Sequence, residues 1–213
     1  MPIKVLLADD HQIIREGLRS LVDREADMDV VAEADNGRRA VQLNEKHTPD
    51  VVIMDINMPD LNGMEATRQI MSTTPSVKIV ALSMLSDQRF ITGMIKAGAS
   101  GYLLKDCAFK ELSQAIRTVA DGKIYLSPAI SGAIREFVSE LPEVGSTSVE
   151  LTAREREVIQ LIAEGKSTKE VAEVLHVSVK TIETHRQNVM RKLRISSVAE
   201  LTKYAIREGL TSI

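Results

Sequence analysis

The stretch Val51-Val52-Ile53-Met54-Asp55 decides the fold class, because four consecutive apolar residues end on a single carboxylate. A short continuous apolar run, without the alternation of a half-exposed strand, is typical of a strand buried on both faces. Further short apolar runs, three of them with one charged residue, occur before residue 122 at Ile3–Ala8, Val30–Ala34, Val77–Leu82 and Gly101–Leu104.

Amphipathic stretches follow each of these runs and have the spacing of helices, near residues 12–24, 37–47, 63–73, 87–98 and 109–121. Five strand–helix units in succession predict a parallel sheet with helices on both faces. Right-handed crossovers leave few topologies, so we predict an α/β doubly wound five-stranded parallel sheet. In such a sheet, ligands bind at the carboxyl ends of the strands, where the strand order reverses.

The chain after residue 121 has a different pattern. The segment Pro142–Ser148 is turn-rich and has no period, which is typical of a linker, and Pro128 can begin a short helix that ends at Leu141. From Leu151 onward one helical pattern follows another, each preceded by a Ser or Thr that can cap it. We therefore predict an α/β domain over 1–121, a linker with a short helix over 122–150, and an all-α four-helix domain over 151–213.

Composition places the chain among globular proteins. Of its 213 residues, 44% are hydrophobic and 27% are charged, which excludes disorder and low-complexity fibres. The apolar runs are far shorter than the roughly 18–20 residues that span a bilayer, and the N-terminus turns acidic too early for a signal peptide. One cysteine, Cys107, can form neither an internal disulfide nor a cysteine zinc site. We expect a cytoplasmic protein with no membrane partner.

Charge is distributed unevenly between the two parts. Residues 151–213 hold eleven Lys and Arg and eight Asp and Glu, a net charge of +3. Residues 1–150 hold sixteen Lys and Arg and twenty-two Asp and Glu, a net charge of −6. This asymmetry indicates two domains with different partners.

Chemically active side chains follow the predicted strands. Asp9 and Asp10 come directly after the first strand and Asp55 ends the third, while Ser83 ends the fourth and Lys105 closes the fifth. The carboxyl ends of parallel strands meet at one edge, so the three carboxylates would lie close together and repel each other unless a cation compensates them. Mg²⁺ prefers such oxygen ligands, and the lysine suits an anion held beside the metal. The set predicts a site where a carboxylate accepts a phosphoryl group.

The motifs Asp9-Asp10, Asp55-Ile56-Asn57-Met58-Pro59, Leu82-Ser83 and Gly101–Lys105 resemble the receiver domain of two-component response regulators, which has a flavodoxin-like fold. This resemblance implies that Asp55 becomes a 4-aspartylphosphate by accepting the phosphoryl group from a sensor histidine kinase. It implies that Asp9, Asp10, Asp55 and the backbone carbonyl of Asn57 hold Mg²⁺. Lys105 would pair with the phosphoryl oxygens, Ser83 would move to hydrogen-bond them, and Tyr102 would swing inward as a switch.

Residues 168–194 have the pattern of a helix-turn-helix. Thr168–Leu175 reads as a short helix, His176–Ser178 as the turn and Val179–Leu193 as a second helix whose outer face is basic. Between Lys180 and Arg194 there are five basic residues and one acidic residue. Basic side chains neutralise phosphates, and short polar side chains reach base edges from a helix in the major groove of DNA.

The same region resembles the LuxR-type domain that follows the receiver in the NarL/FixJ family, through Leu151–Val158, Lys169–Ala172 and Ser178–His185. It departs from that family at His176, where glycine is usual, so we expect a left-handed residue there. The resemblance implies base reading by Glu183, Thr184 and Gln187. It also implies that the DNA backbone is contacted by Lys180, Thr181, His185, Arg191 and Lys192. The last helix, Val198–Glu208, resembles the family's dimerisation helix, with contact by Val198 and Leu201 or a purely internal packing role.

These patterns predict a response regulator that is not an enzyme and that binds double-stranded DNA, as a homodimer when phosphorylated. Without phosphate, the receiver would mask the recognition helix. One alternative is a phosphatase with an aspartyl-phosphate intermediate, but Asn57 stands where such enzymes usually have a second aspartate. Another is a constitutive DNA-binding regulator with an inactive receiver, although no acid, hydroxyl or lysine is missing. A quorum-sensing regulator fits poorly, because only three Tyr, three Phe and no Trp could line a lipid pocket.

Overall fold

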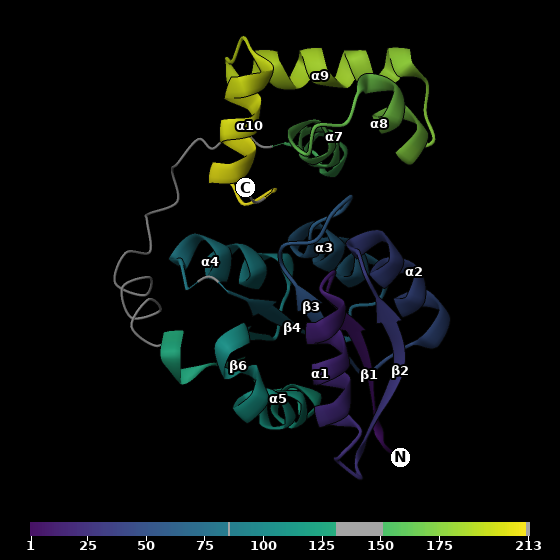
Figure 1. The fold of residues 1–213 in the computed structure, drawn as a ribbon, viewed down its shortest axis with the longest axis vertical. Helices are drawn as coiled ribbons and strands as arrows, with labels where there is room; N and C mark the ends of the chain where they lie inside the picture. The colour runs from purple at the N-terminus through teal and green to yellow at the C-terminus, as the bar shows by residue number, and fades with distance from the viewer. Residues whose placement is uncertain (85, 131–150, 212–213) are drawn as a thin grey trace. The chain divides into compact units, whose positions relative to one another are not determined.

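The computed structural model describes residues 1–84, 86–130 and 151–211, which fall into two compact units. The first unit contains a parallel sheet with helices on both faces, and the second contains the C-terminal helices (Figure 1). This confirms the predicted fold class of an α/β domain followed by an all-α domain. No helix within the described ranges is long and apolar enough to cross a membrane.

The sheet is entirely parallel, in the order β2-β1-β3-β4-β5-β6. From β1 the chain continues to β2 on one side and then to β3 on the other side, so the strand order reverses between β1 and β3, which is the doubly wound arrangement. Among the described residues it has six strands: β1 Ile3–Ala8, β2 Met28–Ala34, β3 Val51–Asp55, β4 Lys78–Ser83, β5 Gly101–Leu104 and β6 Tyr125–Leu126.

The sixth strand corrects the five-stranded prediction. Tyr125 and Leu126 pair with Gly101 and Tyr102 of β5, so the start of the predicted linker extends the sheet. Two residues are too few to show a period of two, and the sequence pattern therefore missed them. A 3₁₀ turn follows at Pro128–Ile130, and the rest of the predicted linker helix lies outside the described residues.

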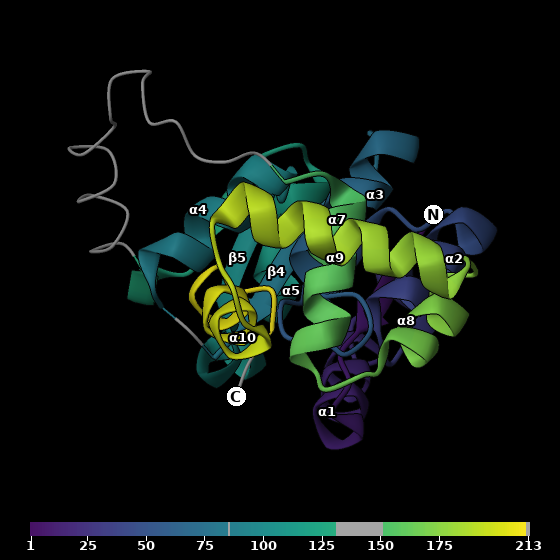
Figure 2. The same ribbon diagram turned by 90° about the horizontal axis from the view of Figure 1, so that it is seen from above.

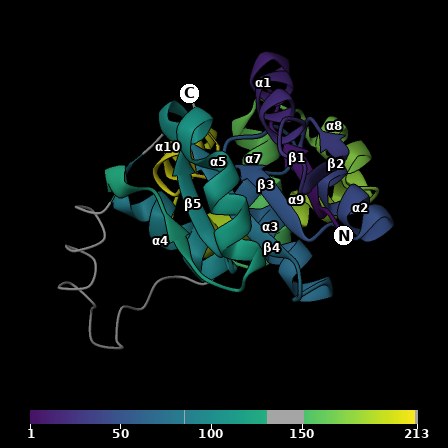
Figure 3. The ribbon, with the colours of Figure 1, turned by 90° about the horizontal axis from the view of Figure 1, so that it is seen from below.

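Five helices cover the sheet. The pair α1 and α5 packs on one face, and α2, α3 and α4 pack on the other (Figures 1 and 3). Helix α5 begins at Lys105, four residues earlier than expected, because no Gly or Pro interrupts the segment and Asp106 suits the positive end of the helix dipole. The helices are α1 Gln12–Val22, α2 Gly37–His47, α3 Gly63–Thr73, α4 Gln88–Ala97 and α5 Lys105–Ala120.

Strand side chains alternate between the two helical layers. Val5 and Leu7 of β1 and Ile53 of β3 share one buried cluster with Leu18 of α1 and Leu112 of α5. Each of these aliphatic side chains stabilises the fold by about 1.5–3 kcal/mol through removal from water. The strands are thereby held rigid up to the carboxyl edge, where their polar end residues emerge.

The C-terminal unit contains four helices in its described residues: α7 Ala153–Ala163, α8 Thr168–Val174, α9 Val179–Leu193 and α10 Val198–Arg207 (Figure 2). Reciprocal capping boxes begin α7 at Thr152, α8 at Ser167 and α10 at Ser197, and the Ser178 side chain caps α9. These caps satisfy orphan N–H groups and set the ends of short helices. The predicted helix starts are confirmed.

The turn between α8 and α9 is formed as expected. His176 has a φ of 53°, the left-handed conformation that glycine adopts at least cost. On either side of it, Val171 and Ala172 of α8 pack with Ile182 of α9 in one buried cluster. The small side chain of Ala172 lets the two helices approach closely, and the packing around it fixes the orientation of α9.

The loop after β3 returns beneath the end of its own strand. The backbone N–H of Gly63 donates to the carbonyl of Ile56 at 2.8 Å, and the Asn62 side chain caps α3 by accepting from the backbone N–H of Glu65 at 2.9 Å. A Cβ atom on Gly63 would lie 1.9 Å from the carbonyl oxygen of Asp55. Glycine is required here because two backbones approach too closely for any side chain.

We predict that Gly63→Ala lowers the free energy of unfolding by about 1–3 kcal/mol, because the backbone of Asp55 has to move away from the new methyl group. Urea unfolding followed by circular dichroism measures this change. Gly93→Ala is the matched control, since its Cβ would meet only the flexible end of Met64. Equal stability of the two variants would contradict the close approach.

Candidate functional site

Four side chains predicted to meet at the carboxyl edge of the sheet lie there in the structure. Asp9 follows β1, Asp55 ends β3, Ser83 ends β4 and Lys105 begins α5 after β5. All four are buried, with 0%, 2%, 1% and 8% of their surfaces exposed, respectively. Burial of so many polar groups at one edge requires that they satisfy each other or a ligand.

Lys105 joins the two buried carboxylates. Its Nζ lies 2.7 Å from Oδ2 of Asp9 and 2.8 Å from Oδ2 of Asp55. The other oxygen of each carboxylate accepts a backbone N–H: Asp9 Oδ1 from His11 at 2.9 Å and Asp55 Oδ1 from Asn57 at 3.3 Å. Each carboxylate is therefore oriented from both sides before any ligand arrives.

Electrostatics leave this cluster short of positive charge. Burial and the neighbouring Asp9 carboxylate raise the pKa of Asp55 to about 6, against the opposing effect of Lys105. Burial lowers the pKa of Lys105, but Asp55 and Asp9 together hold it above its ordinary value, so this lysine is cationic. With Asp10, three carboxylates face one ammonium group, and a divalent cation would balance the remaining charge.

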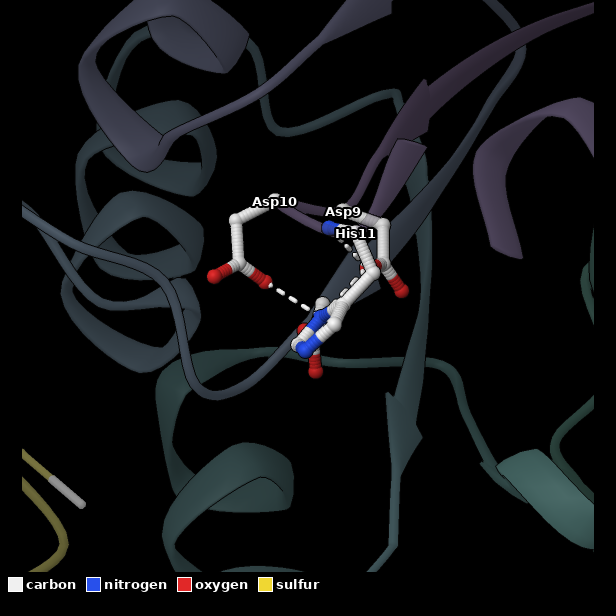
Figure 4. Close-up of side chains that lie close together, drawn as sticks. Asp9, Asp10 and His11 are labelled. Atoms are coloured by element: carbon white, nitrogen blue, oxygen red, sulfur yellow. Dashed lines mark hydrogen bonds and ion pairs between the residues drawn. The ribbon is translucent and has the colours of Figure 1, made fainter. Parts of the chain in front are cut away.

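Asp10 and His11 form the open side of the cluster. Nδ1 of His11 lies 2.8 Å from Oδ1 of Asp10 and 3.3 Å from Oδ1 of Asp9 (Figure 4). Ligand atoms of these three residues and of Asp55 lie within 4.8 Å of one another. The His11 side chain is 63% exposed, so it borders the cluster from the solvent side.

Ser83 and Tyr102 lie next to the acidic cluster, on the neighbouring strands β4 and β5. The Tyr102 side chain is fully buried, and its hydroxyl forms a hydrogen bond with Ser83. Burial raises the pKa of Tyr102 to about 12. The structure thus has Tyr102 in the inward position, and its movement on phosphorylation stays a prediction.

Sequence patterns did not single out Arg15, although it contacts the acidic loop. Its Nη1 donates to the backbone carbonyl of Asp9 at 2.6 Å. The available signal was weak: an arginine three residues before the inward-facing Leu18 on an amphipathic helix. Only the three-dimensional fold shows that this side chain reaches back toward the end of β1.

The eight residues predicted to contact DNA all lie on α9, mostly on its exposed side. Lys180, Thr184 and Gln187 are exposed, three or four residues apart, and therefore share one face of the helix. Glu183, Arg191 and Lys192 are also exposed, whereas Thr181 and His185 are half-buried. Thr181 is engaged locally, since its hydroxyl lies 2.8 Å from that of Ser178.

Lys192 also belongs to the packing of its own unit. Its Nζ donates to Oε2 of Glu155 at 2.8 Å, and Glu155 is the buried residue that completes the α7 capping box. This contact and backbone and side-chain hydrogen bonds to Thr152 outweigh burial and lower the pKa of Glu155. Replacement of Lys192 would therefore disturb α7 as well as any contact with a phosphate.

The two candidate dimer contacts on α10 differ in exposure. Leu201 is fully buried in a cluster with Ile159 and Val189, so it has the internal packing role. Val198 is 44% exposed at the start of the helix and is available for contact with another chain.

Comparisons with known proteins match both units. The description "Response regulator receiver domain" matches residues 5–117, and "Bacterial regulatory proteins, luxR family" matches residues 149–205. The chain is 37% identical to the transcriptional regulatory protein DegU of Brevibacillus brevis, over 99% of this chain and 96% of that protein. It is 40% identical to the oxygen regulatory protein NreC of Staphylococcus epidermidis (strain ATCC 12228 / FDA PCI 1200), over 98% of this chain and 99% of that protein. A solved structure of the Salmonella typhimurium RcsB response regulator has 26% identity and a TM-score of 0.64, over 97% and 98% of the two chains.

We predict that Asp55→Asn stabilises the protein in magnesium-free solution. Because burial raises the pKa of Asp55 in the folded protein to about 6, above its ordinary value of 3.8, its buried charge destabilises the folded state above pH 6. This penalty, up to roughly 3 kcal/mol, disappears as the pH falls toward about 4. Chemical unfolding should show that Asp55→Asn has a clearly higher free energy of unfolding than the wild-type protein at about pH 8 and almost the same value at about pH 4. The exposed Asp121→Asn control should show no such difference, and a pH-independent gain for Asp55→Asn would contradict the prediction.

Proposed function

Because the chain belongs to the two-component response regulators that carry a receiver domain and a LuxR-type DNA-binding domain, we propose that phosphorylation of Asp55 controls its binding to DNA. It is a transcriptional response regulator, and the proposal concerns how its residues perform that role. The observation that supports it best is the ammonium group of Lys105 held 2.7–2.8 Å from two buried carboxylates at the edge of the sheet.

Asp55 is the proposed phosphoacceptor. A carboxylate oxygen of Asp55 forms a bond to phosphorus as the phosphorus–nitrogen bond of a kinase phosphohistidine breaks, and the imidazole nitrogen keeps the electron pair. Because the other groups are already oriented, the protein lowers the barrier by positioning and by charge stabilisation. Lys105 is close enough to turn from the carboxylates to the new phosphoryl oxygens.

The acidic cluster fits Mg²⁺, because its carboxylates are hard oxygen ligands with uncompensated negative charge. Asp9, Asp10, Asp55 and the backbone carbonyl of Asn57 would hold the ion. When bound, it neutralises charge that develops on the transferred phosphoryl group. Asp9 and Asp55 are fixed in advance by Lys105 and by backbone N–H groups, so binding requires little reorganisation of these two side chains.

Ser83 and Tyr102 are the proposed switch. When the Ser83 hydroxyl turns to hydrogen-bond the phosphoryl group, Tyr102 loses that hydrogen bond and must find a new arrangement within the fold. A small local change is thereby passed to the packing between β4, β5 and their covering helices.

We further propose that the partners are a sensor histidine kinase, double-stranded DNA and, after phosphorylation, a second copy of the chain in the cytoplasm. Glu183, Thr184 and Gln187 read bases, while Lys180, Thr181, His185, Arg191 and Lys192 contact the DNA backbone. The protein is a phosphoacceptor without turnover as an enzyme, since Asn57 offers no acid beside Asp55.

Phosphorylation is tested by treating the full chain with acetyl phosphate and Mg²⁺ and measuring its intact mass. We expect one added phosphoryl group in the wild-type protein and none in Asp55→Asn, with Asp121→Asn as the control that is still modified. DNA selection from random sequence, with and without beryllofluoride and Mg²⁺, should recover one operator only after treatment. An unchanged quaternary state and unchanged operator affinity after treatment would refute the proposal.

The residues of α9 should respond differently to substitution. Gln187→Ala should change base preference at one operator position by about 1–3 kcal/mol, because it removes a side chain that reaches a base edge. Lys180→Ala should weaken binding to all sequences alike and reduce the dependence of log K on log salt by about 1. Competition assays with specific and random duplexes measure both effects. Identical behaviour of the two variants would contradict the assigned roles.

A further inference from the structure

Arg15 of α1 is a half-buried cation near the acidic edge, in addition to Lys105, but it contacts a backbone carbonyl and not a carboxylate of the site. Its side chain is only 16% exposed. Nη1 donates to the carbonyl oxygen of Asp9 at 2.6 Å. That carbonyl lies in the peptide bond that links Asp9 to Asp10, the two acids proposed to hold the cation.

The guanidinium group of Arg15 is itself held in place. Its Nε lies 3.3 Å from Oε2 of Glu33 on β2, and the other oxygen of Glu33 lies 2.6 Å from Nη1 of Arg19. Glu33 thus forms ion pairs with two arginines that lie one helical turn apart on α1. The planar guanidinium group suits this use, because it donates in two directions from a fixed geometry.

The backbone around the Asp9–Asp10 peptide is consequently fixed on several sides. The preceding peptide is held by the backbone N–H of Asp9, which donates to the carbonyl of Ala34 on β2 at 3.1 Å, and the Asp9 side chain accepts from the backbone N–H of His11 beyond the Asp9–Asp10 peptide. Arg15 completes this set by holding the carbonyl oxygen. Without it, the peptide could rotate and carry the Asp10 carboxylate away from those of Asp9 and Asp55.

We propose that Arg15 is a positioning residue for the cation site: its hydrogen bond to the Asp9 carbonyl sets the Asp9–Asp10 peptide so that the two carboxylates converge on a divalent cation. The proposal deepens the function above and rests on it. Residues that orient metal ligands from behind commonly change metal affinity by about 10–100-fold when they are replaced.

Charge and position predict opposite results for Arg15→Ala. Removal of a nearby positive charge should by itself strengthen binding of a cation. Loss of the peptide's orientation should weaken it. A weaker affinity therefore identifies positioning, and it cannot arise from the change of charge.

The test is titration calorimetry of the full-length protein with Mg²⁺ alone, without a phosphodonor. We expect the dissociation constant of Arg15→Ala to rise about tenfold, and that of Arg15→Lys to rise less because one donor remains. The control is Arg19→Ala. Like Arg15→Ala, it removes one positive charge and one ion-pair partner of Glu33, but Arg19 makes no hydrogen bond to the Asp9 carbonyl. This variant should bind Mg²⁺ as the wild-type protein does.

Thermal unfolding of each magnesium-free variant separates this role from a general loss of stability. Equal Mg²⁺ affinity in Arg15→Ala and Arg19→Ala, or tighter binding in Arg15→Ala, would overturn the inference. If Arg15→Ala does not fold, the comparison of Arg15→Lys with Arg19→Ala decides the question in the same way. Failure of the wild-type protein to bind Mg²⁺ would instead refute the proposed cation site.

Discussion

The ion pairs that join Lys105 to Asp9 and Asp55 are the interaction on which the rest of the first unit depends. Three ionisable groups from three separate strand–helix units are buried together, and none could remain charged there alone. Such an arrangement adds little net stability, because desolvation offsets most of the attraction. Its value is geometric: it holds two carboxylates and an ammonium group at fixed separations at the edge of the sheet.

The raised pKa of Asp55 shows that its negative charge is unfavourable in this buried arrangement. A carboxylate that titrates near pH 6 in the folded protein has too little positive charge around it. A ligand that supplies positive charge at the edge would bind more tightly for this reason, and it would favour the proposed transfer of a phosphoryl group to Asp55. The buried negative charge of the cluster thus destabilises the folded protein, and a bound cation would remove that penalty.

Sequence reasoning was reliable where a property follows from a repeating pattern. Five of the strands, the capped helices and the left-handed His176 could be predicted, because periodicity and capping are local. The meeting of Asp9, Asp55, Ser83 and Lys105 could be predicted because parallel strands end at a common edge. The strand at Tyr125–Leu126, the pairing of Lys192 with Glu155 and the reach of Arg15 could not, since each depends on which elements become neighbours in the fold.

The way a signal leaves the acidic edge is constrained by screening. A phosphoryl group adds about −1.5 to −2 charges at neutral pH, yet at physiological salt its field decays over about 8 Å in solution. The direct effect of this charge is therefore confined to its surroundings in the first unit. Contacts with two discrete arrangements would carry a signal further, and the hydrogen bond between Ser83 and the fully buried Tyr102 is the contact we propose for this role beside Asp55. A buried aromatic ring cannot be displaced without repacking its neighbours, so loss of this one bond would change the packing on the β4 and β5 side of the sheet. In the proposed switch, packing would transmit the signal, and the phosphoryl charge would select which packing is stable.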